Sequence, residues 1–525
     1  MTVLDVLALA SAAAGAVAGG LRFLRVAQRE HYLPASATRF AWRWWRARAL
    51  GRVAAVVGVV GAVATIKWSG AAFAAAAIAL AGPVGLGLRG RSAKLVWTRR
   101  CRTLGATALA LAALIVSLGA IIGGLAAATA AASWCAIGAP LLIDAAAYLL
   151  SPVEARLGRH HVERAAATIA RDRPRIVAIT GSYGKTSTKG YVAHLLNERY
   201  SLLASPRSFN NKAGLARTVN EHWSRGLELF VAEMGTYAPG EIAAMCSWLP
   251  PSVAVITAIG PVHLERFKRL EVTLKAKAEI AQRAPEVVLN VDDVRLAELA
   301  KRLEAEGKTV VRASGGAPAG GAVPEVVVAL HGHALELQVG CRRVGCVPLE
   351  RDAALPVPSN VACAVGVALG LGMPPEQVLA RLDSLPVAEN RLTRSVTPSG
   401  VIVLDDTFNS NPAGARVALS ELARQGAPGA RRVLVTPGMV ELGPLQFAEN
   451  RALALAAGEI ANELLVVART NRAALLEGAR LACERGSRVN VVVVDRREQA
   501  VAWVRAQLEA GDVVLYENDL PDHYP

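Results

Sequence analysis

Long apolar runs dominate the first third of the chain. They lie at about residues 3–20, 53–66, 71–88 and 104–150. A membrane-spanning helix needs about 20 apolar residues, so the last run is long enough for two helices with a break near Gly123 and Gly124. The pattern therefore predicts about five transmembrane helices within residues 1–152. Apart from Asp5 near the start of the first run, Asp144 is the one charged residue inside these runs, which favours an anchor or docking platform over a transport path.

Arginine residues give the predicted helices an orientation. The basic residues of this region are concentrated in two connections, at residues 22–52 and 89–102. By the positive-inside rule both connections face the cytoplasm, so we expect an external N-terminus and a multi-pass protein of the cell (inner) membrane with cytoplasmic catalytic domains. A cleaved signal peptide explains residues 3–20 less well, because the basic residues follow the apolar run instead of preceding it.

Composition and charge exclude several classes of protein. The chain has 525 residues, of which 53% are hydrophobic and 19% charged, and its net charge is +15. Residues 1–150 account for most of this excess, with 15 Lys and Arg against three acidic residues. Topology explains that excess, so we expect no nucleic-acid partner. The seven cysteines form no CxxC motif, which is typical of reduced thiols.

A candidate phosphate-binding loop follows the apolar region. Residues 176–180 read as a buried strand, and Gly-Ser-Tyr-Gly-Lys-Thr then precedes a helical pattern that runs to Leu196. Glycine lets backbone N–H groups approach an anion, Lys185 can reach terminal phosphates, and Thr186 can hold Mg²⁺. The spacing is two residues shorter than the usual Walker pattern, so a chance glycine-rich turn is the alternative.

Polar residues also end the next two predicted strands. Glu233 follows the apolar run 227–232, and His263 follows the run 253–259. Open α/β sheets place their ligands at the carboxyl ends of such strands. Taken singly, a surface glutamate and a core histidine would explain them, but their order after the loop favours a site. Lys277 then lies in Ala-Lys-Ala-Glu-Ile on the following helical stretch.

Together these blocks resemble the Mur ligase superfamily, most closely its D-alanyl-D-alanine-adding branch, over about residues 175–520. The ATP-binding positions that the resemblance implies are Gly181, Ser182, Tyr183, Gly184, Lys185, Thr186, Ser187, Asn290, Asp292 and Arg391. It implies two Mg²⁺ ions held by Thr186, Glu233, His263 and a carbamylated Lys277, with Lys275 the weaker candidate for carbamylation. The implied catalytic residues are Lys185, His263, Lys277, Asp406 and Arg391. The implied substrate contacts are Asn210, Asn211, Asn409 and Asn411.

The last third of the chain predicts a second α/β region. Apolar runs alternate with helical patterns from Val401 to Leu515, which is typical of a doubly wound sheet. Residues 323–350 read as a small antiparallel flap. We therefore expect an α/β protein of three domains. These are transmembrane helices at 1–152, a central P-loop α/β domain at 153–388 and a C-terminal Rossmann-like domain at 389–525.

Three features depart from the family pattern. We find no counterpart of the soluble N-terminal domain with which the adding enzymes bind a uridine nucleotide. Ser359 stands where the family has a histidine, and Tyr516–Pro521 replaces a Lys-Gly-Ser run. These changes leave the expected ATP chemistry in place, but they leave the identity of both substrates open.

The hypothesis is a membrane-anchored, ATP-dependent ligase that joins a carboxylate to an amine through an acyl phosphate. Its expected partners are an amino acid or peptide amine, a membrane-presented carboxylate acceptor, membrane lipid and membrane partner proteins. Three alternatives stay open. These are a polymer-forming ligase like poly-glutamate synthase, a membrane P-loop ATPase that powers transport, and a catalytically silent scaffold.

Overall fold

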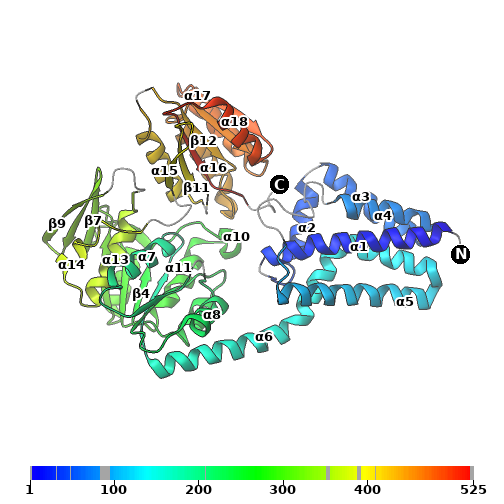
Figure 1. Ribbon diagram of the computed structural model, residues 1–525, viewed down its shortest axis with the longest axis horizontal. Coiled ribbons are helices and arrows are strands. Elements are labelled where there is room, and N and C mark those ends of the chain that lie inside the picture. Colours follow the sequence, from blue (N-terminus) through cyan, green and yellow to red (C-terminus); the bar gives the residue numbers. More distant parts are fainter. Residues whose placement is uncertain are drawn as a thin grey trace. The chain divides into compact units, whose positions relative to one another are not determined.

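The computed structural model describes residues 3–30, 32–47, 49–82, 95–206, 209–349, 355–386, 392–407, 410–427 and 429–520. The chain divides into two compact units (Figure 1). The first unit comprises Met1–Leu157 with Leu520–Pro525, and the second comprises Gly158–Asp519.

The first unit is helical. Its elements are α1 (Val3–Arg29), α2 (Ser36–Ala47), α3 (Ala49–Ala64), η1 (Ser69–Ala71), α4 (Ala72–Ala81), α5 (Arg99–Ile137) and the start of α6 (Ala139–Asp172). Small residues let these helices approach closely. A Cβ added at Gly15 of α1 would lie 3.1 Å from the Cα of Ala76 in α4, and buried alanines of α1, α4 and α5 form one cluster.

Two charged side chains of this unit, the buried Arg22 and the half-buried Asp144, bind helix ends. The Arg22 guanidinium donates to the carbonyl oxygens of Ala79 and Leu80, at 2.7 and 2.9 Å, and so covers the C-terminus of α4. Asp144 accepts the backbone N–H groups of Ala37 and Thr38, at 3.2 and 2.8 Å, in the first turn of α2. Both pairings satisfy backbone groups that a helix leaves open. Asp144 therefore has a structural role.

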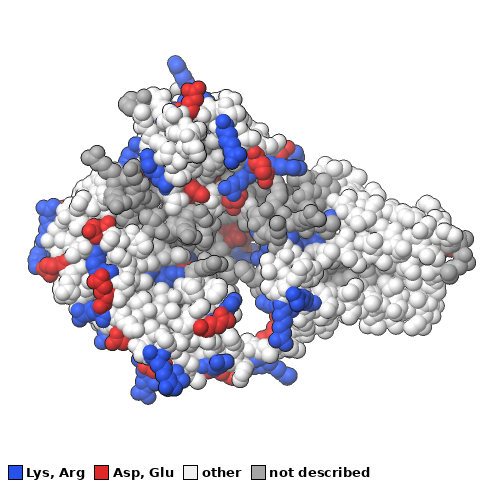
Figure 2. Space-filling model, in the orientation of Figure 1, with Lys and Arg blue, Asp and Glu red and all other residues white. Residues whose placement is uncertain are grey.

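The described residues contain fewer helices able to span a membrane than the five predicted, and residues 83–88 of the third predicted run lie outside the described residues. The break near Gly124 is confirmed, since its φ of 63° interrupts α5. However, α3 has 16 residues and α4 has 10, both short of the roughly 20 that a span needs. Within the described residues, two helices are long and apolar enough to cross a membrane, or up to three if the bent pair α2 and α3 counts as one span. Figure 2 shows almost no charged side chains on the part of this helical unit that is drawn at the right.

The second unit contains two sheets, which confirms the α/β class. The first sheet has the strand order β2-β3-β1-β4-β5-β6-β7-β8-β9. It is parallel from β2 to β7, and β8 and β9 add an antiparallel hairpin at one edge, as the pattern of residues 323–350 predicts. Its strands are β1 (Arg175–Thr180), β2 (Leu202–Ala204), β3 (Leu229–Glu233), β4 (Val253–Ile256), β5 (Glu286–Asn290), β6 (Thr309–Ser314), β7 (Val326–His331), β8 (Ala334–Val339) and β9 (Arg342–Pro348).

Helices cover both faces of this sheet (Figure 1). They are α7 (Lys185–Leu196), α8 (Lys212–His222), α9 (Glu241–Cys246), α10 (Leu264–Phe267), α11 (Leu270–Ala278), η2 (Glu279–Ala281), α12 (Val294–Ala305), α13 (Pro358–Gly370) and α14 (Pro375–Leu379). Strand β1 is buried on both sides from Ile176 to Thr180, which explains its unbroken apolar run. One buried cluster lies against each face.

The second sheet has the order β10-β11-β15-β12-β13-β14, with β10 antiparallel to β11. Its elements are β10 (Thr393–Val396), β11 (Ile402–Asp406), α15 (Pro412–Arg424), β12 (Arg432–Thr436), η3 (Gly443–Leu445), α16 (Gln446–Gly458), β13 (Glu463–Val467), α17 (Arg472–Glu484), β14 (Asn490–Val494), α18 (Arg497–Gln507) and β15 (Val513–Glu517). The predicted doubly wound sheet is confirmed.

Candidate active site

The loop between β1 and α7 has the shape of a phosphate cradle. Gly184 adopts a φ of 79°, and a Cβ there would lie 2.1 Å from Oδ1 of Asn360, so only glycine fits. Helix α7 begins at the next residue, and its N-terminus presents backbone N–H groups that favour an anion. Ser182 fixes the loop from the other side. Its hydroxyl donates to the carbonyl oxygen of Gly260 at 3.1 Å and accepts the Gly260 N–H at 2.9 Å.

Glu233 lies at the centre of a buried polar network beside this loop. Its Oε2 accepts the Thr186 hydroxyl at 3.0 Å and the Lys189 ammonium at 3.1 Å, and its Oε1 accepts the Asn210 amide at 3.0 Å. Burial alone would raise the pKa of Glu233. The charges of Lys189 and Lys185, with the Asn210 hydrogen bond, lower that pKa below its usual value. The group is therefore an ionised carboxylate held in one orientation.

Lysines give this site an excess of positive charge. Lys185 donates to the carbonyl oxygen of Gly181 at 2.8 Å. Lys277, only 4% exposed, reaches the same place from α11. Burial, and after it the charge of Lys185, lower the pKa of Lys277 well below its usual value. Lys189 and Lys185 thus place two positive charges near Glu233, which suits a polyanion such as a chain of phosphates.

A small cavity of about 40 Å³ lies next to the phosphate loop. It is lined by Gly181, Ser182, Lys185, Asn210, Gly235, Thr236, Tyr237, Val262, His263 and Lys277. A water molecule occupies about 30 Å³ of liquid, so the cavity has room for an ion or a water and not for a nucleotide. His263 adopts a φ of 58°, its Nδ1 contacts Oε2 of Glu441, and its ring meets that of Tyr237 edge-on at 4.7 Å.

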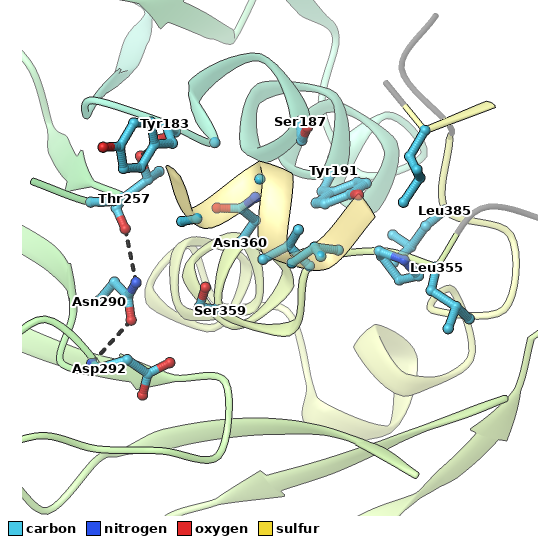
Figure 3. Close-up of a pocket in the computed structure, with 18 of the residues that line it drawn as sticks. Tyr183, Ser187, Tyr191, Thr257, Asn290, Asp292, Leu355, Ser359, Asn360 and Leu385 are labelled. Atoms are coloured by element: carbon cyan, nitrogen blue, oxygen red, sulfur yellow. Dashed lines mark hydrogen bonds between the residues drawn. The ribbon is translucent and has the colours of Figure 1, made fainter. Parts of the chain in front are cut away.

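A much larger cavity, of about 1360 Å³, lies beside the loop. Asn290 and Asp292, for which the family resemblance implies contacts on the adenosine side, line it. Figure 3 shows Asn290 between Thr257 and Asp292. Its amide donates to the Thr257 carbonyl at 2.9 Å, and its Oδ1 accepts the Asp292 N–H at 3.1 Å. The Asp292 carboxylate in turn accepts the Ser314 hydroxyl at 2.6 Å and the Gly315 N–H at 2.8 Å. These bonds fix the wall of a cavity large enough for a nucleoside.

Four more of the predicted site residues line the large cavity. These are Tyr183, Ser187, Asp406 at the end of β11, and Asn411. Asn411 also caps α15 by accepting the Gly414 N–H at 2.9 Å.

Asn211 caps α8 in the same way, through the N–H of Gly214 at 2.8 Å. Arg391 and Asn409 lie outside the described residues. Lys275 lies in the last turn of α11, where it is exposed.

Sequence reasoning missed several residues of the site. Lys189 is four residues after Lys185, so both lie on one side of α7, and this spacing could have indicated it. Thr257 donates its hydroxyl to the carbonyl oxygen of Tyr183, and Asn360 packs against Gly184. Neither of these contacts has a local sequence signal.

Glu517 accounts for one of the departures from the family pattern. It ends β15 and is fully buried, and its carboxylate accepts the Thr436 hydroxyl at 2.7 Å and contacts the Ser410 hydroxyl. Burial raises the pKa of Glu517 to about 8 against the opposing effect of the Thr436 hydrogen bond, and the charge of Asp406 adds to the increase. The segment that departs from the family's Lys-Gly-Ser run thus contains a buried acid.

The donors present are those that Mg²⁺ prefers. Among the described residues no three His, Cys, Asp or Glu side chains come together as a metal site. A hydroxyl and a carboxylate, from Thr186 and Glu233, lie 3.0 Å apart next to the phosphate cradle. Mg²⁺ takes oxygen ligands and usually completes its shell with waters and substrate phosphates, so these few protein ligands fit it.

The geometry thus defines a nucleotide-binding α/β enzyme whose phosphate loop adjoins a buried carboxylate and a cluster of lysines. Residues 179–338 match the Mur ligase middle domain, and residues 390–516 match the Mur ligase, glutamate ligase domain. The chain belongs to the Mur ligase family and is an ATP-dependent peptide ligase.

Similar sequences and solved structures belong to the same family. The chain is 35% identical over 363 residues to the UDP-N-acetylmuramoyl-tripeptide–D-alanyl-D-alanine ligase of Mycobacterium tuberculosis, covering 65% of this chain and 69% of that one. The ligase of the same name from Escherichia coli is 30% identical over 296 residues, covering 55% and 62%. MurF of Thermotoga maritima, solved with ADP, has the same fold, with a TM-score of 0.59 at 22% identity over 69% of this chain and 80% of that one.

The predicted location in the inner membrane is wrong. It depended on five spans, and the described residues offer two helices, or up to three, that could cross a membrane. The relatives are named for a UDP-linked tripeptide and a dipeptide, so they lend no support to a membrane-presented acceptor, a lipid ligand or a membrane partner protein.

Proposed function

We propose that the chain joins the amine of an amino acid or dipeptide to a peptide carboxylate of a cell-wall precursor. The observation that carries this proposal is that the phosphate loop, His263 and Lys277 line one small cavity, and that Glu233 is bound to Thr186 and Asn210 beside it. The names of the relatives make a UDP-linked muramyl tripeptide and D-alanyl-D-alanine the first substrates to test.

The reaction proceeds in two steps that need no protein nucleophile. The acceptor carboxylate attacks the γ-phosphorus of ATP, so that a C–O–P bond forms and ADP leaves. The amine then attacks the acyl carbon, loses a proton, and expels inorganic phosphate as the amide forms. Lys185 and the N-terminus of α7 stabilise the negative charge that develops on the transferred phosphoryl group.

Mg²⁺, when bound, neutralises phosphate charge and polarises the γ-phosphoryl group. Thr186 and Glu233 would hold one ion, and His263 with a carbamylated Lys277 would hold a second. Carbamylation needs a neutral amine and CO₂, and the burial of Lys277 next to Lys185 favours the neutral amine. The carbamate would then supply the carboxylate oxygens that this cavity otherwise lacks.

The C-terminal residues complete the proposed site. Asp406 and Asn411 line the large cavity, where we propose that they face the nucleotide and the incoming amine. Arg391 and Asn409 keep their predicted roles at the ATP and at the amine. Exclusion of water around the acyl phosphate protects it from hydrolysis.

The test is a ligation assay with purified full-length chain, ATP, the UDP-linked muramyl tripeptide and a panel of amino acids and dipeptides. Phosphate release and product mass are measured together. We expect amine-dependent phosphate release, loss of ligation in Lys185→Ala and normal ligation in Lys301→Ala, whose side chain lies on the surface of α12. Phosphate release without dependence on any amine would identify an ATPase instead, and a ladder of products would identify a polymer-forming ligase.

A further inference from the structure

Lys189 lies one helical turn beyond the phosphate-loop lysine and is only 6% exposed. Its ammonium lies 3.1 Å from Oε2 of Glu233, and both side chains of this ion pair are buried. A lysine is rarely buried in this way unless it is paired. The pair joins two elements far apart in the sequence, α7 and the end of β3.

The same carboxylate has two further partners. Thr186 donates to the oxygen that Lys189 also binds, and Asn210 donates to the other oxygen. Of these three partners, only Asn210 lines the small cavity. Lys189 and Thr186 bind the carboxylate outside that lining.

We propose that Lys189 is a positioning residue, which holds the Glu233 carboxylate in the orientation that binds Mg²⁺ together with the nucleotide phosphates. This inference rests on the proposed function, in which Glu233 is a metal ligand. An ammonium bound to one oxygen fixes the rotation of the carboxylate, and residues that orient a metal ligand typically change metal affinity by about 10–100-fold when removed.

The test measures binding and not turnover. The affinity of a fluorescent ADP analogue is titrated with Mg²⁺ and again with EDTA, and the ratio of the two dissociation constants gives the coupling between metal and nucleotide. We expect Lys189→Met to lower this ratio by about tenfold or more, Lys189→Arg to restore part of it, and the surface control Lys301→Met to leave it unchanged. A purely structural role would lower the melting temperature and leave the ratio as in the wild type, which would overturn the proposal. A rise in the ratio would overturn it too, because Lys189 would then act only as a competitor of the metal.

A second variant separates this inference from the proposed function. Glu233→Gln should abolish the coupling by itself, and adding Lys189→Met to it should cause no further loss, since the lysine acts through the carboxylate. The double variant can also be measured if Lys189→Met alone does not fold, because the double variant leaves no buried carboxylate without a partner. A further loss of coupling in the double variant would overturn the proposal. If Glu233→Gln keeps the coupling, the metal site itself is assigned wrongly. If only Lys189→Met keeps it, the metal site stands and the role of Lys189 is refuted.

Discussion

Glu517 makes the stability of the C-terminal sheet depend on pH. Burial raises the pKa of this carboxyl to about 8, whereas an unperturbed glutamate ionises near 4.5. Because the folded pKa is the higher one, the folded state keeps a proton that the unfolded chain has released between these values. One pKa unit corresponds to about 1.4 kcal/mol. The free energy of unfolding should therefore fall from pH 4.5 upward, by at most about 5 kcal/mol in total, and level off above pH 8.

Glu517→Gln should remove this dependence. The glutamine amide can accept the Thr436 hydroxyl and donate to Ser410, so the packing is preserved. We expect the variant to match the wild type near pH 4.5 and to be more stable by a few kcal/mol at pH 8.5, as an order of magnitude. Urea unfolding at several pH values measures this, with hydrogen exchange of residues 513–517 as a local probe because a chain with several regions need not unfold in one step. Glu298→Gln, an exposed residue of α12, is the control. The same pH slope in Glu517→Gln and wild type would refute the reasoning.

Three further predictions concern the site and its supports. Gly184→Ala should abolish nucleotide binding, since its Cβ would lie 2.1 Å from the Asn360 side chain at a φ of 79°; normal affinity for an ADP analogue would contradict the assigned loop. Lys277→Ala should lose ligation and regain part of it with added short carboxylates, and intact protein should carry the mass of one CO₂ at Lys277. Full activity without rescue would count against carbamylation. Asn411→Ala should lower stability by about 1 kcal/mol through loss of the α15 cap, measured by urea unfolding; an unchanged midpoint would show that the cap contributes nothing.

The sequence predicts best what is encoded locally. The strand, loop and helix from Ile176 to Leu196 could be predicted because the glycines, the lysine and the apolar run lie within about 20 residues. Both sheets could be predicted for the same reason, since their strands are short apolar runs between helical patterns. The general rule for strand ends could predict that Glu233 and His263 lie at the same edge of the first sheet, where parallel strands β3 and β4 end.

The rest depends on contacts between distant residues. The ion pair of Lys189 could not be predicted, because its partner Glu233 lies 44 residues later in the chain and is brought next to it by β3. Glu517 reads as an ordinary polar residue until Ser410 and Thr436 enclose it. Apolar composition alone also did not show where helices end within the first third of the chain, where α3 has 16 residues and α4 has 10.

The hydrogen bonds between Ser182 and Gly260 mean that the phosphate loop is ordered before any nucleotide arrives. Thr257 holds the same loop through the carbonyl of Tyr183, so residues that follow the end of β4 fix the conformation of the loop. The conformational entropy of the loop is therefore lost during folding and not during binding. A substitution at residues 257–260, some 75 residues away in sequence, would accordingly weaken nucleotide binding without touching the nucleotide, by returning disorder to the loop.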